Sequence, residues 1–324
     1  MLVRIAALAL SLAAMASPAS AADYPDHTIR MIVPFAAGGG TDVLARIIAQ
    51  NLNAKWGQPV VVENQPGASG AIGTRFAMKA APDGYTLLMA STGALMAVSA
   101  GADGEGPFDV NKYLTPIIVA AAPPYLLVVN PALPVKSTAE LISYAKQKPD
   151  GLTFGSSGVG AASHLSGLLF GSMTGIKMLH IPYKGTGPAV TDLIGGRIDM
   201  MFAPGPVVQP FVASGQLRAL GVTDTRRSKF YPDVPTVADG VPGYESVGWF
   251  GLLAPPHTPP EIVNKINEAI VAAMQTQEFR DHLATLGAEP TPQTPEEFGR
   301  YINADVAKWS KLVKDNDVQL PGGK

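Results

Sequence analysis

The feature that most restricts how this chain can fold is a strand-length apolar run that passes through glycines directly into a helix. The run at Met31–Pro34 is followed by Phe35-Ala36-Ala37-Gly38-Gly39-Gly40. A helix is predicted from Thr41-Asp42, because its apolar residues recur at the spacing of one helix face: Leu44, Ile47, Ile48 and Leu52. Thr41 or Asp42 is expected to cap this helix.

Three successive glycines let the backbone approach a ligand closely and adopt left-handed angles. The free N–H groups of the first helical turn point into such a loop and favour an anion such as phosphate or carboxylate. The dinucleotide fingerprint fails, because Val43 stands where its last glycine belongs, and the P-loop fails because Thr41-Asp42 follows Gly40. A purely structural turn that binds nothing is the alternative that this stretch alone leaves open.

Residues 1–22 are predicted to be a secretory signal peptide. Arg4 supplies the positive start, Ile5–Met15 is a short apolar run, and Ala19-Ser20-Ala21 is a cleavage site. The run is shorter than the ~20 apolar residues of a membrane span. The chain has no cysteine, so no lipid anchor at a cysteine and no disulfide is expected. We therefore expect a free protein in the periplasm.

Composition argues against a nucleic-acid partner. The net charge is -2, and loss of Arg4 with the signal peptide makes it -3, without any block of lysine or arginine. Hydrophobic residues make up 47% of the chain, which is enough to bury a sizeable core. The remaining ~300 residues have room for two domains.

Apolar runs alternate with helical patterns along the chain, which predicts an α/β fold with mostly parallel sheets. Ligands of such sheets bind at the carboxyl ends of the strands. Residues 35–41 and Ser91-Thr92 follow predicted strands. A second glycine-rich turn, residues 155–164, follows a strand at 151–154 and, like the first turn, leads from a predicted strand into a predicted helix. Two such turns that face each other would make one cleft with two sets of backbone donors.

Two long apolar passages, 114–130 around Pro123-Pro124 and 246–254, are predicted to cross between two domains. They place domain 1 at residues 23–124 and 248–324, and domain 2 at 125–247. The C-terminal region is predicted to be helical and to cover the sheet of domain 1. Three helix starts have capping-box spacing: Ser137 with Glu140, Thr258 with Glu261, and Thr294 with Glu297.

The sequence contains neither the nucleophile elbow of a serine hydrolase nor a recognised histidine metal motif. Ser157 has Gly155 before it but Val159 after it, so it is not a nucleophile elbow. The five histidines make no recognised metal spacing, and no cofactor or metal is expected. His164 has two possible roles: it contacts the ligand, or it forms a hydrogen bond that only supports the fold. Tyr183 and Lys184 are read either as a base and an anion clamp or as ordinary loop residues. Phe35 and Trp249 either line a pocket or fill the core, and for Trp249 we expect the core.

Several segments, in this order along the whole mature chain, resemble the extracytoplasmic substrate-binding proteins of tripartite tricarboxylate transporters, the Bug family. They are Tyr24-Pro25, residues 29–42 and 63–74, Pro82-Asp83-Gly84-Tyr85, residues 155–164, Pro182-Tyr183-Lys184-Gly185, Gly196-Arg197-Ile198-Asp199 and Asp233-Val234-Pro235-Thr236. The resemblance implies a two-domain Venus-flytrap fold (type II-like) with two crossing strands as the hinge. It also implies capture of a small organic acid for delivery to membrane transporter subunits.

The resemblance implies that the two glycine-rich turns hold one carboxylate of the ligand. By position, the contacts are Phe35, Ala36, Ala37, Gly38, Gly39, Gly40, Thr41 and Thr92 on one side, and Ser156, Ser157, Gly160, Ser163 and His164 on the other. The far end is lined by Tyr183, Lys184, Phe202, Ala203, Pro204 and Gly205. The resemblance also implies that many relatives carry an acidic residue where Ala203 stands, so a ligand with an ammonium group is not expected here.

Two other classes of function stay open at this point. A periplasmic hydrolase would need an activated serine. A sensor-linked binding protein would capture the same acid but report it to a signalling partner. The resemblance favours a monomeric binding protein without enzymatic activity, and it leaves open whether the acid is a mono-, di- or tricarboxylate or an aromatic acid.

Overall fold

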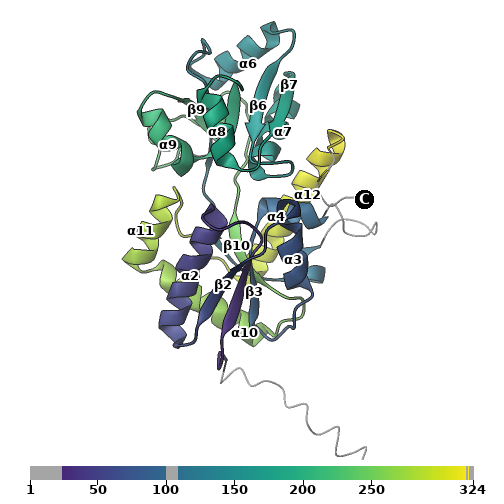
Figure 1. Cartoon of the computed structure of the whole chain (residues 1–324), viewed down its shortest axis with the longest axis vertical. Helices are drawn as coiled ribbons and strands as arrows, with labels where there is room; N and C mark the ends of the chain where they lie inside the picture. Colours follow the sequence, from purple (N-terminus) through teal and green to yellow (C-terminus); the bar gives the residue numbers. More distant parts are fainter. Residues whose placement is uncertain (1–23, 100–108, 319, 321–324) are drawn as a thin grey trace, which may run out of the picture.

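The computed structural model describes residues 24–99, 109–318 and 320. The predicted signal peptide lies outside these residues. Two five-stranded sheets form two lobes, one above the other along the long axis of the molecule (Figure 1). We call them the first lobe, which contains the sheet β2-β1-β3-β10-β4, and the second lobe, which contains the sheet β7-β6-β8-β5-β9.

The strands of the first lobe are β1 Ile29–Val33, β2 Val60–Asn64, β3 Thr86–Ser91, β4 Thr115–Ala121 and β10 Phe250–Ala254. Its helices are α2 Gly40–Trp56, α3 Ala71–Met78, α4 Thr92–Ser99, α5 Val110–Tyr113, α10 Pro260–Met274, α11 Gln277–Thr285 and α12 Pro295–Asp315, with a 3-10 turn η2 at Ala68–Gly70. Strand residues alternate between two apolar clusters. Met31 packs on the side of α2 and α10, and Ile32 on the side of α3, α4 and α12.

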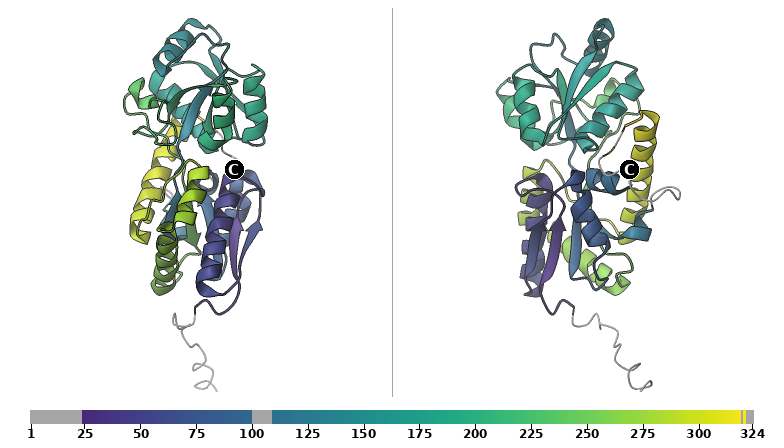
Figure 2. Two further views of the ribbon diagram at one scale, coloured as in Figure 1. Left: turned by 90° about the vertical axis from the view of Figure 1, so that its left-hand side faces the viewer. Right: turned by 45° about the vertical axis from the view of Figure 1, so that its right-hand side comes forward.

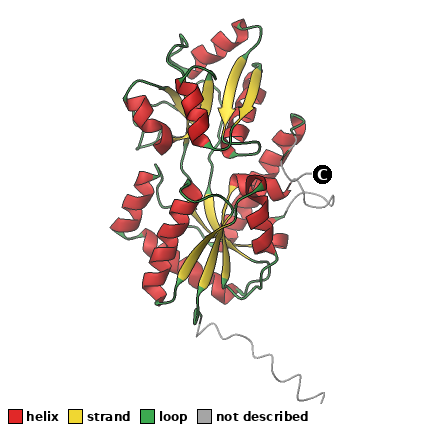
Figure 3. Ribbon diagram, in the orientation of Figure 1, coloured by secondary structure: helices red, strands yellow, loops and turns green. Residues whose placement is uncertain are grey.

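The strands of the second lobe are β5 Tyr125–Val129, β6 Leu152–Ser156, β7 Met178–Pro182, β8 Met200–Pro204 and β9 Arg218–Val222. Its helices are α6 Thr138–Gln147, α7 Ala162–Thr174, α8 Thr186–Ile194 and α9 Gly205–Ala213, with a 3-10 turn η3 at Val237–Asp239. Leu127 faces the cluster that includes α6 and α7, and Leu126 the cluster that includes α8 and α9. Both lobes are therefore layers of helix, sheet and helix (Figure 3).

The predicted mostly parallel sheets are confirmed. In each sheet one strand, β10 or β5, runs antiparallel to its two neighbours, and the others point the same way. Each antiparallel strand is the one by which the chain enters its lobe from the other lobe. The two connecting segments lie side by side, because Pro124 and Val247 form an antiparallel bridge. The domain boundaries at 124/125 and 247/248 remain predictions.

Local patterns account for most helix positions. Leu44, Ile48 and Leu52 of α2 are buried, as their spacing predicts. Helix α12 lies along the first lobe (Figure 2) and contacts β4, so the C-terminal helices do cover that sheet. The capping box at Thr294 is present. The box expected at Thr258 is wrong: α10 begins after Pro259, and the Thr258 hydroxyl donates instead to the carbonyl oxygen of Pro255.

Candidate functional site

The carboxyl ends of the parallel strands in both sheets lie at the edges from which the connecting segments leave. In the first sheet, Ser91 at the end of β3 pairs with Phe250 at the start of β10. In the second sheet, Pro204 at the end of β8 pairs with Tyr125 at the start of β5. Helices begin at or soon after these ends: α2, α4, α7, α8 and α9. Their amino termini direct positive partial charge toward the junction between the lobes.

The first glycine-rich turn is an open loop at this junction. Residues 36–40 are exposed, and Phe35 is half-buried. Gly38 has φ +86°, whereas Gly39 is extended at φ -80° and ψ 166°. Helix α2 begins at Gly40, so the N–H groups of its first turn have no partner within the helix. This exposed group of donors is the structural basis of the candidate site.

The predicted cap of α2 by Thr41 or Asp42 is wrong. Gly39 occupies the N-cap position, and no side chain caps the helix. Thr41 and Asp42 both lie inside the first turn and are buried. The Asp42 carboxylate turns back to accept a hydrogen bond from the Gly38 N–H at 2.9 Å. Asp42 therefore organises the turn that precedes the helix, and it does not cap the helix itself.

The second glycine-rich turn is held by three buried side chains. The Ser156 hydroxyl oxygen accepts from the Gly158 N–H at 3.1 Å, and the Ser163 hydroxyl oxygen accepts from the Ser157 N–H at 3.0 Å. His164 Nδ1 accepts from the Gly160 N–H at 3.0 Å, so the ring carries its proton on Nε2. These predicted site residues shape the loop. Residues 157–159, 161 and 162 are half-buried and form the accessible part of this turn.

A second histidine, which sequence reasoning did not single out, completes this cluster. His180 of β7 stacks on His164 with ring centroids 3.9 Å apart, and its Nε2 lies 2.6 Å from the Ser156 hydroxyl oxygen. Burial lowers the pKa of His164 to about 3, with a further contribution from His180, and burial lowers the pKa of His180 to about 4. Both rings are neutral at physiological pH, so they add no positive charge to the site.

Acid is expected to destabilise the protein through this pair. In the unfolded chain both histidines bind a proton near pH 6.5, well above their pKa values in the folded state. Since the unfolded state then binds more protons, the free energy of unfolding falls as pH drops through this region. We expect a loss of roughly 2 kcal/mol between about pH 7 and about pH 5.5, measured by urea unfolding. A variant with both His164→Asn and His180→Asn should lose most of this slope; an unchanged slope would contradict the assignment.

The Ser156–His180 pair has the atoms of a hydrolytic dyad but not its exposure. Ser156 is fully buried, at 0% exposure. Its hydroxyl group also hydrogen-bonds the main chain of Gly158. A nucleophile must reach the reacting carbon of its substrate. Because Ser156 cannot do so in this loop, the pair stabilises the turn.

Tyr183 and Lys184 follow β7 at the same junction, but Tyr183 has a partner of its own. Its hydroxyl group donates to Asp192 at 2.8 Å, and Asp192 also pairs with Arg197 at 2.6 Å. Burial and the Asp192 carboxylate raise the pKa of Tyr183, so the group stays protonated and is unsuited to act as a base. Lys184 is exposed on the loop.

At the end of β8 the side chains of Phe202 and Ala203 are buried, so a ligand could contact mainly the main chain there. Phe202 and Ala203 are fully buried, and Phe202 packs on Phe170 with centroids 5.7 Å apart. Pro204 is half-buried and precedes Gly205, the first residue of α9. A Cβ on Gly205 would lie 2.1 Å from the Tyr231 hydroxyl oxygen, so this turn requires glycine because of close packing.

Two residues at the junction, Ser69 and Phe250, were missed by sequence reasoning. The Ser69 hydroxyl donates to the carbonyl oxygen of Val159 at 3.2 Å, which joins η2 of the first lobe to the second glycine-rich turn. Ser69 also has φ +54°, an uncommon angle for serine. Phe250 lies 3.4 Å from the position of a Cβ on Gly40. Trp249 is buried, as expected, and its N–H donates to the Thr92 hydroxyl oxygen at 3.4 Å.

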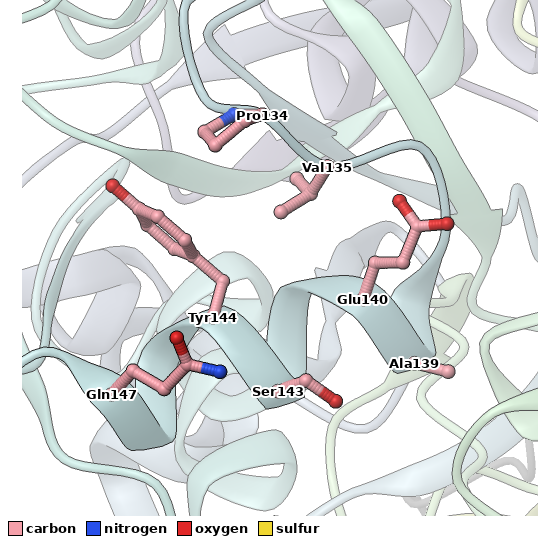
Figure 4. A pocket seen from close by; sticks show the side chains of 7 residues that line it. All are labelled: Pro134, Val135, Ala139, Glu140, Ser143, Tyr144 and Gln147. Carbon is pink, nitrogen blue, oxygen red and sulfur yellow. The ribbon is translucent and has the colours of Figure 1, made fainter.

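Two surface hollows lie elsewhere. One, of about 360 Å³, lies against α6 in the second lobe and is lined by Val135, Glu140 and Tyr144 among others (Figure 4). The other, of about 540 Å³, lies between Phe230 and the helices α10 and α11. Neither is lined by a predicted site residue. Within the described ranges, no helix is long and apolar enough to cross a membrane, and no group of three or more histidine, aspartate or glutamate side chains is arranged to hold a metal ion.

One family of known proteins is similar to this chain both in sequence and in fold. The model of the tripartite tricarboxylate transporter family receptor matches residues 44–318. Protein BugT of Bordetella pertussis (strain Tohama I) is 38% identical over 320 residues, which is 98% of each chain. The structure of R. palustris Rpa4515 with adipate has a TM-score of 0.79 at 38% identity, covering 90% of this chain and 98% of that one.

A further solved relative is MatC (Rpa3494) from Rhodopseudomonas palustris with bound malate. It has a TM-score of 0.78 at 32% identity, and the match covers 90% of this chain and 100% of that one. The family match extends over most of the described residues and includes both lobes. This chain belongs to the tripartite tricarboxylate transporter receptor family, and it is a periplasmic solute-binding protein of that family, not an enzyme.

Proposed function

We propose that this protein captures a small organic acid between its lobes and delivers it to a membrane transporter. The observation that carries the proposal is the exposed turn at residues 36–40, where the amino terminus of α2 opens toward the junction. Donors of this kind form charge-assisted hydrogen bonds with a carboxylate. The adipate and malate bound to the two solved relatives support the same chemical class.

The second glycine-rich turn supplies the opposite side of the proposed site. Ser69 adjoins Gly70, and a Cβ on Gly70 would lie 3.1 Å from the Phe35 ring. Gly70 therefore lies close to Phe35 of the first turn, and the Ser69–Val159 hydrogen bond links this region to the second turn. We therefore propose that main-chain donors from both turns share one carboxylate. The proposed contacts from the end of β8 are made by the main chain of residues 202–205.

The energetics fit capture and release. Each charge-assisted hydrogen bond contributes roughly 1.5–3 kcal/mol. Three or four of them, less the cost of closing the lobes and ordering the ligand, give about -8 kcal/mol, which corresponds to micromolar affinity. The two adjacent connecting segments at Pro124 and Val247 are the proposed hinge, with domain boundaries at 124/125 and 247/248.

Ligand binding is expected to raise stability in proportion to occupancy. An organic acid at about 100 times its dissociation constant should stabilise the protein by ~2.7 kcal/mol. A thermal-shift panel of mono-, di-, tri- and aromatic carboxylates, with neutral sugars as the control, measures this effect. Small-angle scattering should show a smaller radius of gyration with the same acid, because the lobes close on it. Stabilisation by a neutral sugar and by no carboxylate would reject the proposal.

Delivery is tested separately in cells. Deletion of the gene should abolish uptake of the acid identified in the panel. Retained uptake together with a lost transcriptional response would assign the protein to a sensor. We propose that the mature protein acts in the periplasm as a monomer, after removal of residues 1–22.

A further inference from the structure

The carboxylate of Asp42 carries a negative charge beside the turn that is proposed to bind an anion. Asp42 is only 3% exposed. Its Oδ2 atom lies 2.9 Å from the N–H of Gly38, which is part of the exposed turn. An uncompensated negative charge at this position would repel a ligand carboxylate. The surroundings of Asp42 therefore determine whether the turn attracts or repels an anion.

Arg46, one helical turn later in α2, compensates this charge directly. Its Nε donates to Asp42 Oδ2 and its Nη2 to Asp42 Oδ1, each at 3.0 Å. Such a two-point contact matches the planar guanidinium to the carboxylate and holds both in a defined orientation. The Arg46 side chain is 54% exposed, so its positive charge extends from the buried carboxylate to the surface.

Asn64, at the end of β2, connects this ion pair to the other side of the turn. Its Nδ2 lies 2.9 Å from Asp42 Oδ1 and 3.1 Å from the carbonyl oxygen of Phe35, to both of which it donates. Arg46 Nη2 also donates to Asn64 Oδ1 at 3.3 Å. The network thus holds the turn at Phe35 and at Gly38, on either side of exposed residues 36 and 37.

We infer that Arg46 is a positioning residue that neutralises Asp42, so that the fixed glycine-rich turn remains attractive to a carboxylate ligand. The inference rests on the proposed function of that turn. Although burial alone would raise the pKa of Asp42, hydrogen bonds from Arg46, Gly38 and Asn64 hold this pKa below its usual value. Asp42 therefore stays ionised at physiological pH, and its charge requires compensation under the conditions of binding.

The test is a comparison of single and double variants. Arg46→Met removes the positive charge but keeps an unbranched side chain that favours a helix. It leaves the Asp42 charge beside the turn, and it should raise the dissociation constant at least about tenfold. Adding Asp42→Asn removes that charge, and because an amide oxygen can still accept from the Gly38 N–H, affinity should return to within about threefold of the parent. Lys55→Met, on the exposed last turn of α2, is the matched control for loss of one positive charge.

Calorimetry with adipate and with malate measures the four affinities, and circular dichroism verifies folding. Nuclear magnetic resonance of the Asp42 carboxyl group gives a readout without ligand: its pKa should rise in Arg46→Met, because the two hydrogen bonds from the guanidinium group are lost. A raised pKa with unchanged affinity would overturn the inference but not the proposed function. A double variant that binds no better than Arg46→Met would also overturn it. A parent protein that binds no acid of the thermal-shift panel would instead overturn the proposed function.

Discussion

Gly39→Val is expected to weaken carboxylate binding at least about 100-fold and to leave the fold intact. Gly39 has φ -80° and ψ 166°, which valine adopts readily, so the left-handed angle anticipated for this loop belongs to Gly38 and not to Gly39. A Cβ on Gly39 would find no atom nearer than the Ala36 carbonyl oxygen at 3.8 Å. The ligand-free protein therefore has room for valine, whereas a ligand oxygen that approaches the N–H groups of α2 does not.

This separation of binding from folding makes Gly39→Val a sharp test of the site. Ala54→Val, at an exposed position near the end of the same helix, is the control for a β-branched residue and should bind as the parent does. Calorimetry gives the affinities, and thermal unfolding should place all three proteins within a few degrees of one another. If folded Gly39→Val retained the parent affinity, the first glycine-rich turn would be a structural connection and the proposed site would be wrong.

Asp305→Ala is expected to lower the free energy of unfolding by roughly 3–4 kcal/mol. The Asp305 carboxylate accepts hydrogen bonds from the indole N–H groups of Trp249, at 2.8 Å, and Trp309, at 2.7 Å. Both tryptophans are buried, at 1% and 2% exposure. Alanine would leave two buried donors without partners and a cavity beside them, and each unpaired donor costs about 1–3 kcal/mol.

Asp305 also lies beside the proposed hinge, because its partner Trp249 is close to the Pro124–Val247 bridge in the chain. Trp249 immediately precedes β10 in the connecting segment, and its main-chain N–H contacts Thr92 at the start of α4. Asp315→Ala is the matched control, because this exposed carboxylate on the same helix pairs only with Lys311 in the described structure and should change stability by about 0.5 kcal/mol or less. Urea midpoints measure both variants. Equal midpoints for Asp305→Ala and Asp315→Ala would show that the indole contacts contribute little to stability.

The sequence by itself determined the strand–turn–helix units and the crossing of the chain between two sheets. These features depend on local chemistry: the spacing of apolar residues selects helix or strand, and glycines with adjacent prolines mark the turns. The capping box at Thr294 was predictable for the same reason, since both of its hydrogen bonds lie within four residues. The family was identifiable from the sequence as well, because the segments that resemble the Bug family follow one another in order along the mature chain.

Only the tertiary structure decided which of the predicted site residues are exposed donors and which hold the loops. Asp42 does not cap its helix, because Gly39 occupies the N-cap and the Asp42 carboxylate instead pairs with Arg46 and with Asn64, which is distant in sequence. His180 lies in a strand without any motif, and its role follows only from its stacking on His164. Side-chain partners of this kind depend on which elements pack together, and periodicity and turn propensity carry no information about that packing.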